Sequence, residues 1–180
     1  MCKQSIQISD PADFSLLFEQ THHLVFRYIY SLHGGPQEEV EDLTADTYWR
    51  AWRARYKFQG NHSGATGWLL KIAKRLVIDS YRRSKTRGFE MDIEKVIIPI
   101  TGATPEEKAL QKEQIEEMFI LIQDLPIEHR EMIILRYMFG WRVKDIGTLL
   151  DIPENTVSVT LRRAFNKIKN KWDSMDIRDE

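Results

Sequence analysis

The fold of the second half of the chain is decided by the stretch WRVKDIGTLLDIPENTVSVTLRRAFNKIKNKW, residues 141–172. Apolar residues recur at helical spacing on both sides of a tight turn at 151–152, which predicts one helix over 143–150 and another over 154–171. Two short helices joined in this way have the spacing of a helix-turn-helix. The side chains predicted to face inward are Val143, Ile146, Leu150, Ile152, Val157, Leu161, Ala164 and Ile168.

The second of these helices is predicted to expose a polar face. Arginine pairs with guanine edges or phosphates and asparagine pairs with adenine, so such a helix is of the kind that enters a major groove. A helical hairpin with an ordinary polar surface has the same spacing and stays open as an alternative. The DNA-binding candidates are Asn155, Thr156, Ser158, Val159, Arg162 and Arg163.

The first half contains aromatic residues interleaved with basic ones, in the stretch DTYWRAWRARYKFQG at residues 46–60. Arginines bind phosphates, and aromatic rings stack on unpaired bases with ~1–3 kcal/mol per base. A basic helix follows, up to Arg83. The combination predicts a surface for single-stranded or melting DNA. The rings are too many for one small core, although we expect at least one of Trp49, Trp52 and Trp68 to be core.

The remaining helix-start and helix-stop signals predict an all-α fold of two small helical domains, at residues 10–86 and 105–173, joined by a flexible linker at residues 87–104. Asp10-Pro11 predicts a helix start and Gly34 a helix end. Further helices are predicted over 37–56, from 65 to 83, from the capping box at 104–107 to before 125, and over 127–139. The predicted apolar stripe of the 37–56 helix is Val40, Leu43, Thr47, Ala51 and Ala54.

Charge is segregated along the sequence, although the net charge of the 180 residues is only −1. Almost all of the charged residues in 10–46 are acidic, and almost all of those in 50–87 are basic. This favours one face for a polyanion and another for a basic or mixed partner, with solvated helix faces as the alternative. Cys2 is the only cysteine, so no intrachain disulfide can form. With no signal peptide pattern and no apolar run of about 20 residues, we expect a cytoplasmic protein without membrane insertion.

No motif of catalysis or metal binding is found in the sequence. It lacks a Walker loop, a nucleophile elbow and a zinc motif. His22 and His23 are adjacent, and neighbouring residues point to different faces of a helix. We therefore expect no enzyme activity, no cofactor and no metal.

Two stretches resemble the extracytoplasmic-function (ECF) group of bacterial RNA polymerase sigma factors. EDLTADTYWRAWRARYKFQG…WLLKIAKRLVIDSYRR, from residue 41, resembles their region two, and LPIEHREMIILRYMFGWRVKDIGTLLDIPENTVSVTLRRA, from residue 125, resembles their region four. The match covers most of the chain from about residue 14 to 171. The resemblance implies a sigma factor that binds the β′ and β subunits of core RNA polymerase, recognises and melts promoter DNA, and is held inactive by an anti-sigma factor.

The resemblance also implies residue roles. Asp42, Leu43, Asp46 and Thr47 would bind the β′ coiled coil, and the helix from Pro153 would read the minus-thirty-five element. The loop at 59–64 would hold a flipped base of the non-template strand. The residues implied to contact and melt the minus-ten element are Trp49, Trp52, Arg53, Tyr56, Lys57, Phe58, Asn61, His62, Lys71, Lys74 and Arg75.

The chain departs from the family pattern in a few places. Ser158, Val159 and Thr160 stand where lysine, serine and arginine are common, which predicts fewer phosphate contacts. Gly147 stands where alanine is usual, a small cost to the helix. Arg75 stands where asparagine is frequent. A free-standing helix-turn-helix regulator would need only the second half, and an RNA-binding module would leave the helix-turn-helix unexplained.

Overall fold

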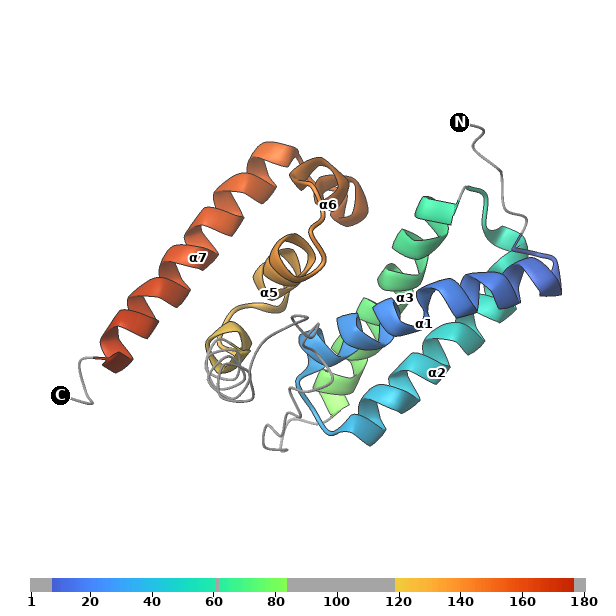
Figure 1. The fold of residues 1–180 in the computed structure, drawn as a ribbon, viewed down its shortest axis with the longest axis horizontal. Helices are drawn as coiled ribbons and strands as arrows, with labels where there is room; N and C mark the ends of the chain where they lie inside the picture. The colour runs from blue at the N-terminus through green and yellow to red at the C-terminus, as the bar shows by residue number, and fades with distance from the viewer. Residues whose placement is uncertain (1–7, 61, 84–118, 177–180) are drawn as a thin grey trace, which may run out of the picture. The chain divides into compact units, whose positions relative to one another are not determined.

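The computed structural model describes residues 8–60, 62–83 and 119–176 (Figure 1). The elements in these ranges are all helical, and they belong to two compact units, residues 1–92 and 93–180. The prediction of an all-α fold with two helical units is confirmed. The predicted linker at 87–104 and the capping box at 104–107 lie outside the described residues.

The first unit is built from three long helices, α1 (Pro11–His33), α2 (Gln37–Ala54) and α3 (His62–Arg83), and each packs against the other two (Figure 1). A single 3-10 turn, η1 (Arg55–Lys57), follows α2. The predicted 37–56 helix therefore ends two residues early, and α3 begins three residues before its predicted start. The core side chains include Leu17, Val25, Ile29, Leu32, Val40, Ala51, Leu69, Ala73, Leu76 and Val77.

The ends of α1 are set by the signals read from the sequence. The Asp10 carboxylate accepts a hydrogen bond from the Ala12 N–H at 2.8 Å, with proline at the first helical position. This satisfies one of the amides that a helix start leaves without a partner. Gly34 ends the helix with a left-handed φ of 64°, and its N–H donates to the Tyr30 carbonyl at 2.8 Å.

A buried hydrogen-bond chain joins α1 to α2. The Thr21 hydroxyl donates to the Leu17 carbonyl at 2.6 Å. Its only hydrogen is thereby used, so the Tyr48 hydroxyl, 2.8 Å away, must donate to the Thr21 oxygen. Burial raises the pKa of Tyr48 to about 12.

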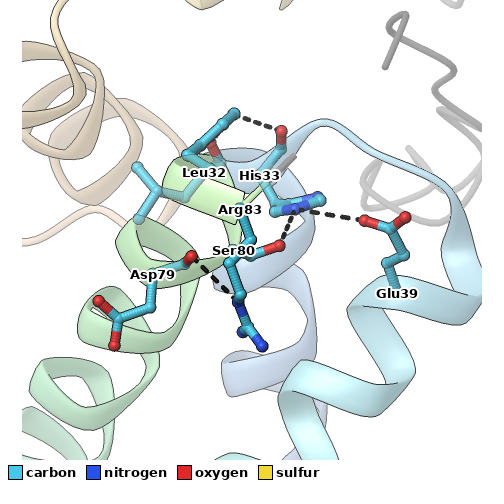
Figure 2. A network of polar contacts seen from close by, with 7 residues as sticks. Leu32, His33, Glu39, Asp79, Ser80 and Arg83 are labelled. Atoms are coloured by element: carbon cyan, nitrogen blue, oxygen red, sulfur yellow. Dashed lines mark hydrogen bonds and ion pairs between the residues drawn. The ribbon is translucent and has the colours of Figure 1, made fainter. Parts of the chain in front are cut away.

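One end of the first unit brings together opposite charges that are far apart in the sequence. The buried imidazole of His33, at the end of α1, has Nε2 3.3 Å from the Ser80 hydroxyl of α3 and 3.7 Å from the Glu39 carboxylate of α2 (Figure 2). One turn along α3, Arg83 Nε donates to the Asp79 carbonyl at 3.2 Å. The basic end of α3 thus lies near the acidic start of α2.

The second unit is described from residue 119, and residues 119–123 are helical. They are followed by α5 (Ile127–Ile133) and η3 (Ile134–Met138). The predicted helix over 127–139 is present as far as residue 138, and residues 134–138 form a π-helical turn. The Phe139 N–H donates to the Ile134 carbonyl at 3.2 Å, five residues back. Gly140 then ends the segment with a φ of 67°, as predicted.

Arg130 is a buried cation that holds the junction before α5. Its side chain is 6% exposed. Its Nη2 donates to the carbonyl of Gln123 at 2.7 Å and to that of Leu125 at 3.3 Å. Gln123 is the last residue of one helix and Leu125 lies in the turn before the next, so a side-chain donor replaces the missing helical partner.

The predicted helix-turn-helix is present as α6 (Val143–Leu150) and α7 (Glu154–Asp176). Ile146, Val157, Leu161 and Ala164 are buried as predicted, and Leu149, which the apolar pattern missed, is buried with them. Val143, Leu150, Ile152 and Ile168 are half-buried at the edges of this interface.

The turn between α6 and α7 depends on Gly147. Asp151 takes a left-handed φ of 58°, and its N–H and that of Ile152, the latter at 3.0 Å, both donate to the Gly147 carbonyl. A Cβ atom at position 147 would lie 2.8 Å from the Ile152 carbonyl oxygen, closer than such atoms normally approach. Gly147 is therefore more than a cost to the helix, because it makes room for the turn.

Candidate nucleic-acid and polymerase interface

The solvent face of α2 presents acid, aromatic and base in order along one stripe. Asp42, Asp46, Trp49 and Arg53 follow one another at helical spacings of four, three and four residues, so they share a face. Asp42 and Arg53 are exposed and the Trp49 side chain is 55% exposed. Asp46 is half-buried and pairs with Arg50 at 3.1 Å. The Arg53 guanidinium carbon lies 4.8 Å from the centre of the Trp49 ring.

Leu43 and Thr47 lie on the opposite face of α2, in the core of the unit. They are 7% and 0% exposed. The Thr47 hydroxyl donates to the Leu43 carbonyl at 2.7 Å, so it is satisfied within the helix. In this structure the two side chains therefore offer almost no surface to a partner, and their predicted contact with the polymerase stays a prediction. Asp42 and Asp46 keep their side chains available.

The end of α2 carries a stack of side chains. The Trp52 ring is half-buried and meets the Phe14 ring edge to face, with ring centres 5.1 Å apart and an interplanar angle of 71°. The Arg55 guanidinium carbon lies 3.5 Å from the centre of the Trp52 ring and 4.1 Å from the centre of the Tyr56 ring. Tyr56 itself is 70% exposed. The exposed Tyr56 ring and the Arg55 guanidinium that contacts it thus lie at the end of α2.

The remaining minus-ten candidates lie on η1, the following loop and α3. Lys57 is exposed, and Phe58 is half-buried with its ring 5.2 Å from that of Trp68. On α3, one turn apart, Lys71 and Arg75 are exposed, and Lys74 is half-buried. Asn61 lies outside the described residues, and of His62 only its place at the start of α3 is described.

The three tryptophans of the first unit differ from expectation. Trp49 is exposed, while Trp52 and Trp68 are half-buried, so none of the three belongs to the fully buried core. The expectation of at least one core tryptophan is wrong. The core is filled by aliphatic side chains and by the tyrosines Tyr28, Tyr30 and Tyr48 instead.

The start of α7 exposes its polar side chains as predicted. Asn155, Thr156, Ser158, Arg162 and Arg163 are exposed and Val159 is half-buried.

An exposed aromatic pair was missed by the sequence analysis. Phe165, on α7, is 51% exposed, and its ring centre lies 6.3 Å from that of Tyr137, which is 60% exposed. A bulky apolar residue on an otherwise polar helix face was the signal that could have found it.

No group of three or more potential metal-ligating side chains is found in the described ranges. Within the same ranges, no helix is long and apolar enough to cross a membrane.

Comparison with known proteins connects both units to transcription. The family model of sigma-70 region 2 matches residues 17–87, and that of sigma-70 region 4 matches residues 120–168, together more than half of the chain. The chain is similar to the ECF RNA polymerase sigma factor SigX of Bacillus subtilis, 26% identical over 162 residues, with 87% of this chain and 81% of SigX covered. It is 29% identical over 181 residues to the ECF RNA polymerase sigma-E factor of Escherichia coli K12, with 93% and 91% covered.

The chain belongs to the ECF sigma factors. It is thus a promoter-directing sigma factor, a transcription initiation factor. The region 2 match across the first unit leaves no place for the alternative of a free-standing helix-turn-helix regulator, which would need only the second unit.

Solved structures show the same fold for this sigma factor. The sigma factor RpoE of Bartonella quintana, solved with the anti-sigma factor NepR, gives a TM-score of 0.67 at 19% identity, with 88% of this chain and 95% of RpoE covered. CnrH, solved with the cytosolic domain of CnrY, gives a TM-score of 0.64 at 19% identity, with 92% and 90% covered.

Proposed function

We propose that this sigma factor divides core-polymerase binding and promoter melting between the two halves of α2. The observation that carries the proposal is the single stripe on the solvent face that runs from exposed Asp42 through half-buried Asp46 to exposed Trp49 and Arg53. Carboxylates repel a DNA backbone, whereas they suit a basic or mixed protein surface. Asp42 and Asp46 therefore bind the β′ coiled coil, and buried Leu43 and Thr47 support them by holding the helix in its unit.

The second half of the stripe and the elements after it form the minus-ten surface in this proposal. Exposed rings such as Tyr56 offer π-faces to unpaired bases, and stacking of this kind contributes ~1–3 kcal/mol per base. Arg53, Lys57, Lys71 and Arg75 are exposed cations that suit the phosphates of the displaced strand. The other members of the surface are Trp49, Trp52, Phe58, Asn61, His62 and Lys74.

The start of α7 reads the minus-thirty-five element. Its candidates Asn155, Thr156, Ser158, Arg162 and Arg163 are exposed on the helix that follows the turn, which is where a helix-turn-helix contacts base edges. Val159, half-buried, supplies apolar contact. With two arginines on this face, the affinity for duplex DNA should depend only moderately on salt.

The cellular location and the regulation of the protein follow from its partners. Core RNA polymerase and promoter DNA are cytoplasmic in bacteria, so the sigma factor acts there. RpoE was solved with the anti-sigma factor NepR, and CnrH was solved with the cytosolic domain of CnrY. By analogy, an anti-sigma factor holds this chain inactive until a signal releases it.

Reconstitution tests the function as a whole. The purified chain is mixed with the matching core RNA polymerase, and transcripts are mapped from a fragmented genomic library. We expect a stable complex and discrete start sites with a shared promoter sequence. A folded chain that does not bind core polymerase would contradict the proposal.

The division of labour within α2 is tested on a promoter mapped in this way. Asp42→Ala should weaken core binding and leave opening by the assembled holoenzyme unchanged, while Trp52→Ala and Arg53→Ala should do the reverse. Glu19→Ala, which removes an exposed carboxylate from α1, is the matched control and should change neither step. Failure of both classes of variant at the same step would show that the division is wrong.

A further inference from the structure

Arg55 makes contacts in the first unit that its place in a basic stretch does not suggest. It sits where α2 ends and η1 begins. Its Nη1 donates to the Trp52 carbonyl at 2.7 Å, its Nη2 to the Tyr56 hydroxyl at 2.6 Å, and its Nε to the Ser9 carbonyl at 3.4 Å. Each of its three nitrogens is thus hydrogen-bonded to an oxygen of the protein itself.

The plane of the same guanidinium contacts two aromatic rings. Its carbon lies 3.5 Å from the centre of the Trp52 ring and 4.1 Å from that of Tyr56. A planar guanidinium can stack on rings and donate hydrogen bonds from its edge at once, which the compact ammonium of lysine cannot do. The Arg55 side chain therefore holds the two rings together through its guanidinium, and it is only half-exposed.

The two rings depend on Arg55 to different degrees. Trp52 also has Phe14 against it, with ring centres 5.1 Å apart. Tyr56 is 70% exposed, on a single 3-10 turn, and its guanidinium contact is its main restraint among the contacts described for it. An exposed ring that is already held in place loses less conformational freedom when a base stacks on it.

We propose that Arg55 is a positioning residue for promoter melting: it orients the Tyr56 and Trp52 rings for base stacking and does not contact a phosphate. This rests on the proposed minus-ten role of these two rings. Arg53, two residues earlier, belongs to the other class, because its side chain is exposed on the solvent face, where its described contact is the Trp49 ring at 4.8 Å.

The test follows promoter opening by holoenzyme, with 2-aminopurine in the minus-ten element of a promoter mapped by the reconstitution. The variants are Arg55→Ala, Arg55→Lys, Tyr56→Ala and the double variant Arg55→Ala/Tyr56→Ala. From the usual strength of cation–ring contacts, Arg55→Ala should slow opening by about 2- to 30-fold. Arg55→Lys keeps the charge and should be nearly as slow. The double variant should be no slower than Tyr56→Ala, because Arg55 acts largely through that ring.

Salt dependence separates positioning from a phosphate contact. Loss of a phosphate contact lowers the slope of log affinity against log salt by about one, so Arg55→Ala should leave this slope unchanged while Arg53→Ala lowers it. Core binding and thermal unfolding of each variant report its folding, and Arg55→Lys serves where Arg55→Ala unfolds.

The outcomes separate the inference from the function on which it rests. A lowered salt slope for Arg55→Ala, or full additivity of the two substitutions, would overturn the positioning role while leaving the minus-ten surface in place. If the variants Tyr56→Ala, Trp52→Ala and Arg55→Ala each opened the promoter normally, the assignment of these rings to the minus-ten surface would itself be wrong.

Discussion

Replacement of Gly147 by alanine should destabilise the second unit, against the ordinary preference of helices. In a helix interior, alanine is favoured over glycine by about 1 kcal/mol. Here the new Cβ would lie 2.8 Å from the Ile152 carbonyl oxygen. This neighbour is backbone in a tight turn, so the contact is relieved only by moving the turn.

The size of the effect follows from the groups that must move. Overpacking of a filled site costs about 1–3 kcal/mol. Moving the turn also weakens the bonds that the Asp151 and Ile152 N–H groups donate to the Gly147 carbonyl, each contributing about 0.5–1.5 kcal/mol. After the gain in helix preference is subtracted, we expect a net loss of about 1–2 kcal/mol, or about a 5- to 30-fold change in the folded-to-unfolded ratio.

Hydrogen exchange measured by mass spectrometry resolves this loss within the full chain. In Gly147→Ala, the most protected amides of α6 and α7 should exchange about 5- to 30-fold faster, while those of α1 to α3 keep their rates. Thr148→Ala is the matched control, because Thr148 is the next residue of α6 and is exposed; its rates should stay close to the original. Slower exchange in Gly147→Ala would show that helix preference outweighs the contact and that the reasoning is wrong.

Three further substitutions test other parts of the structure. The pKa of Tyr48 is raised to about 12 from 10.0, so between these values the folded chain keeps a proton that the unfolded chain loses. The stability present below pH 10 should therefore fall as the pH rises toward 12, which urea unfolding at a series of pH values should show. Tyr48→Phe should reduce this fall, and at neutral pH it should lose about 0.5–1.5 kcal/mol of stability with the bond to Thr21. Arg130→Met should destabilise the second unit by about 1–3 kcal/mol, since it leaves buried carbonyls without their donor; an unchanged urea midpoint would contradict this. Arg162→Ala should weaken binding to the duplex minus-thirty-five element by ~1–3 kcal/mol if this arginine reads a guanine, and an unchanged footprint there would remove it from that role.

Local signals in the sequence were sufficient for the two ends of α1 and for the helix-turn-helix. Asp10 and Gly34 act at α1 as their side-chain chemistry and backbone freedom predict. The π-helical turn at 134–138 could not be predicted from the sequence. The hydrogen-bond acceptor in a π-helix is only one residue further back than in an α-helix, and over five residues this hardly changes the hydrophobic spacing. The placing of the tryptophans also needed the tertiary structure, since a small core can be filled by several choices of large side chain.

The polymerase site shows how two lines of inference can disagree. The apolar spacing already placed Leu43 and Thr47 in the buried stripe of α2, while the family resemblance placed the same residues at a partner surface. The structure agrees with the spacing. The position of Arg55 between two rings had no sequence signal, because arginine in a basic stretch beside aromatics suits a phosphate contact equally well.

The segment before α1 has a practical meaning for dissecting the protein. Ile8 is 1% exposed, and the carbonyl of Ser9 accepts a bond from Arg55. The sigma-70 region 2 match begins only at residue 17. An expression fragment that begins at residue 17 would lose the buried side chains of Ile8 and Phe14, the helix cap at Asp10 and one hydrogen-bond acceptor of Arg55. A truncation or fusion junction meant to preserve the first unit therefore belongs upstream of Ile8.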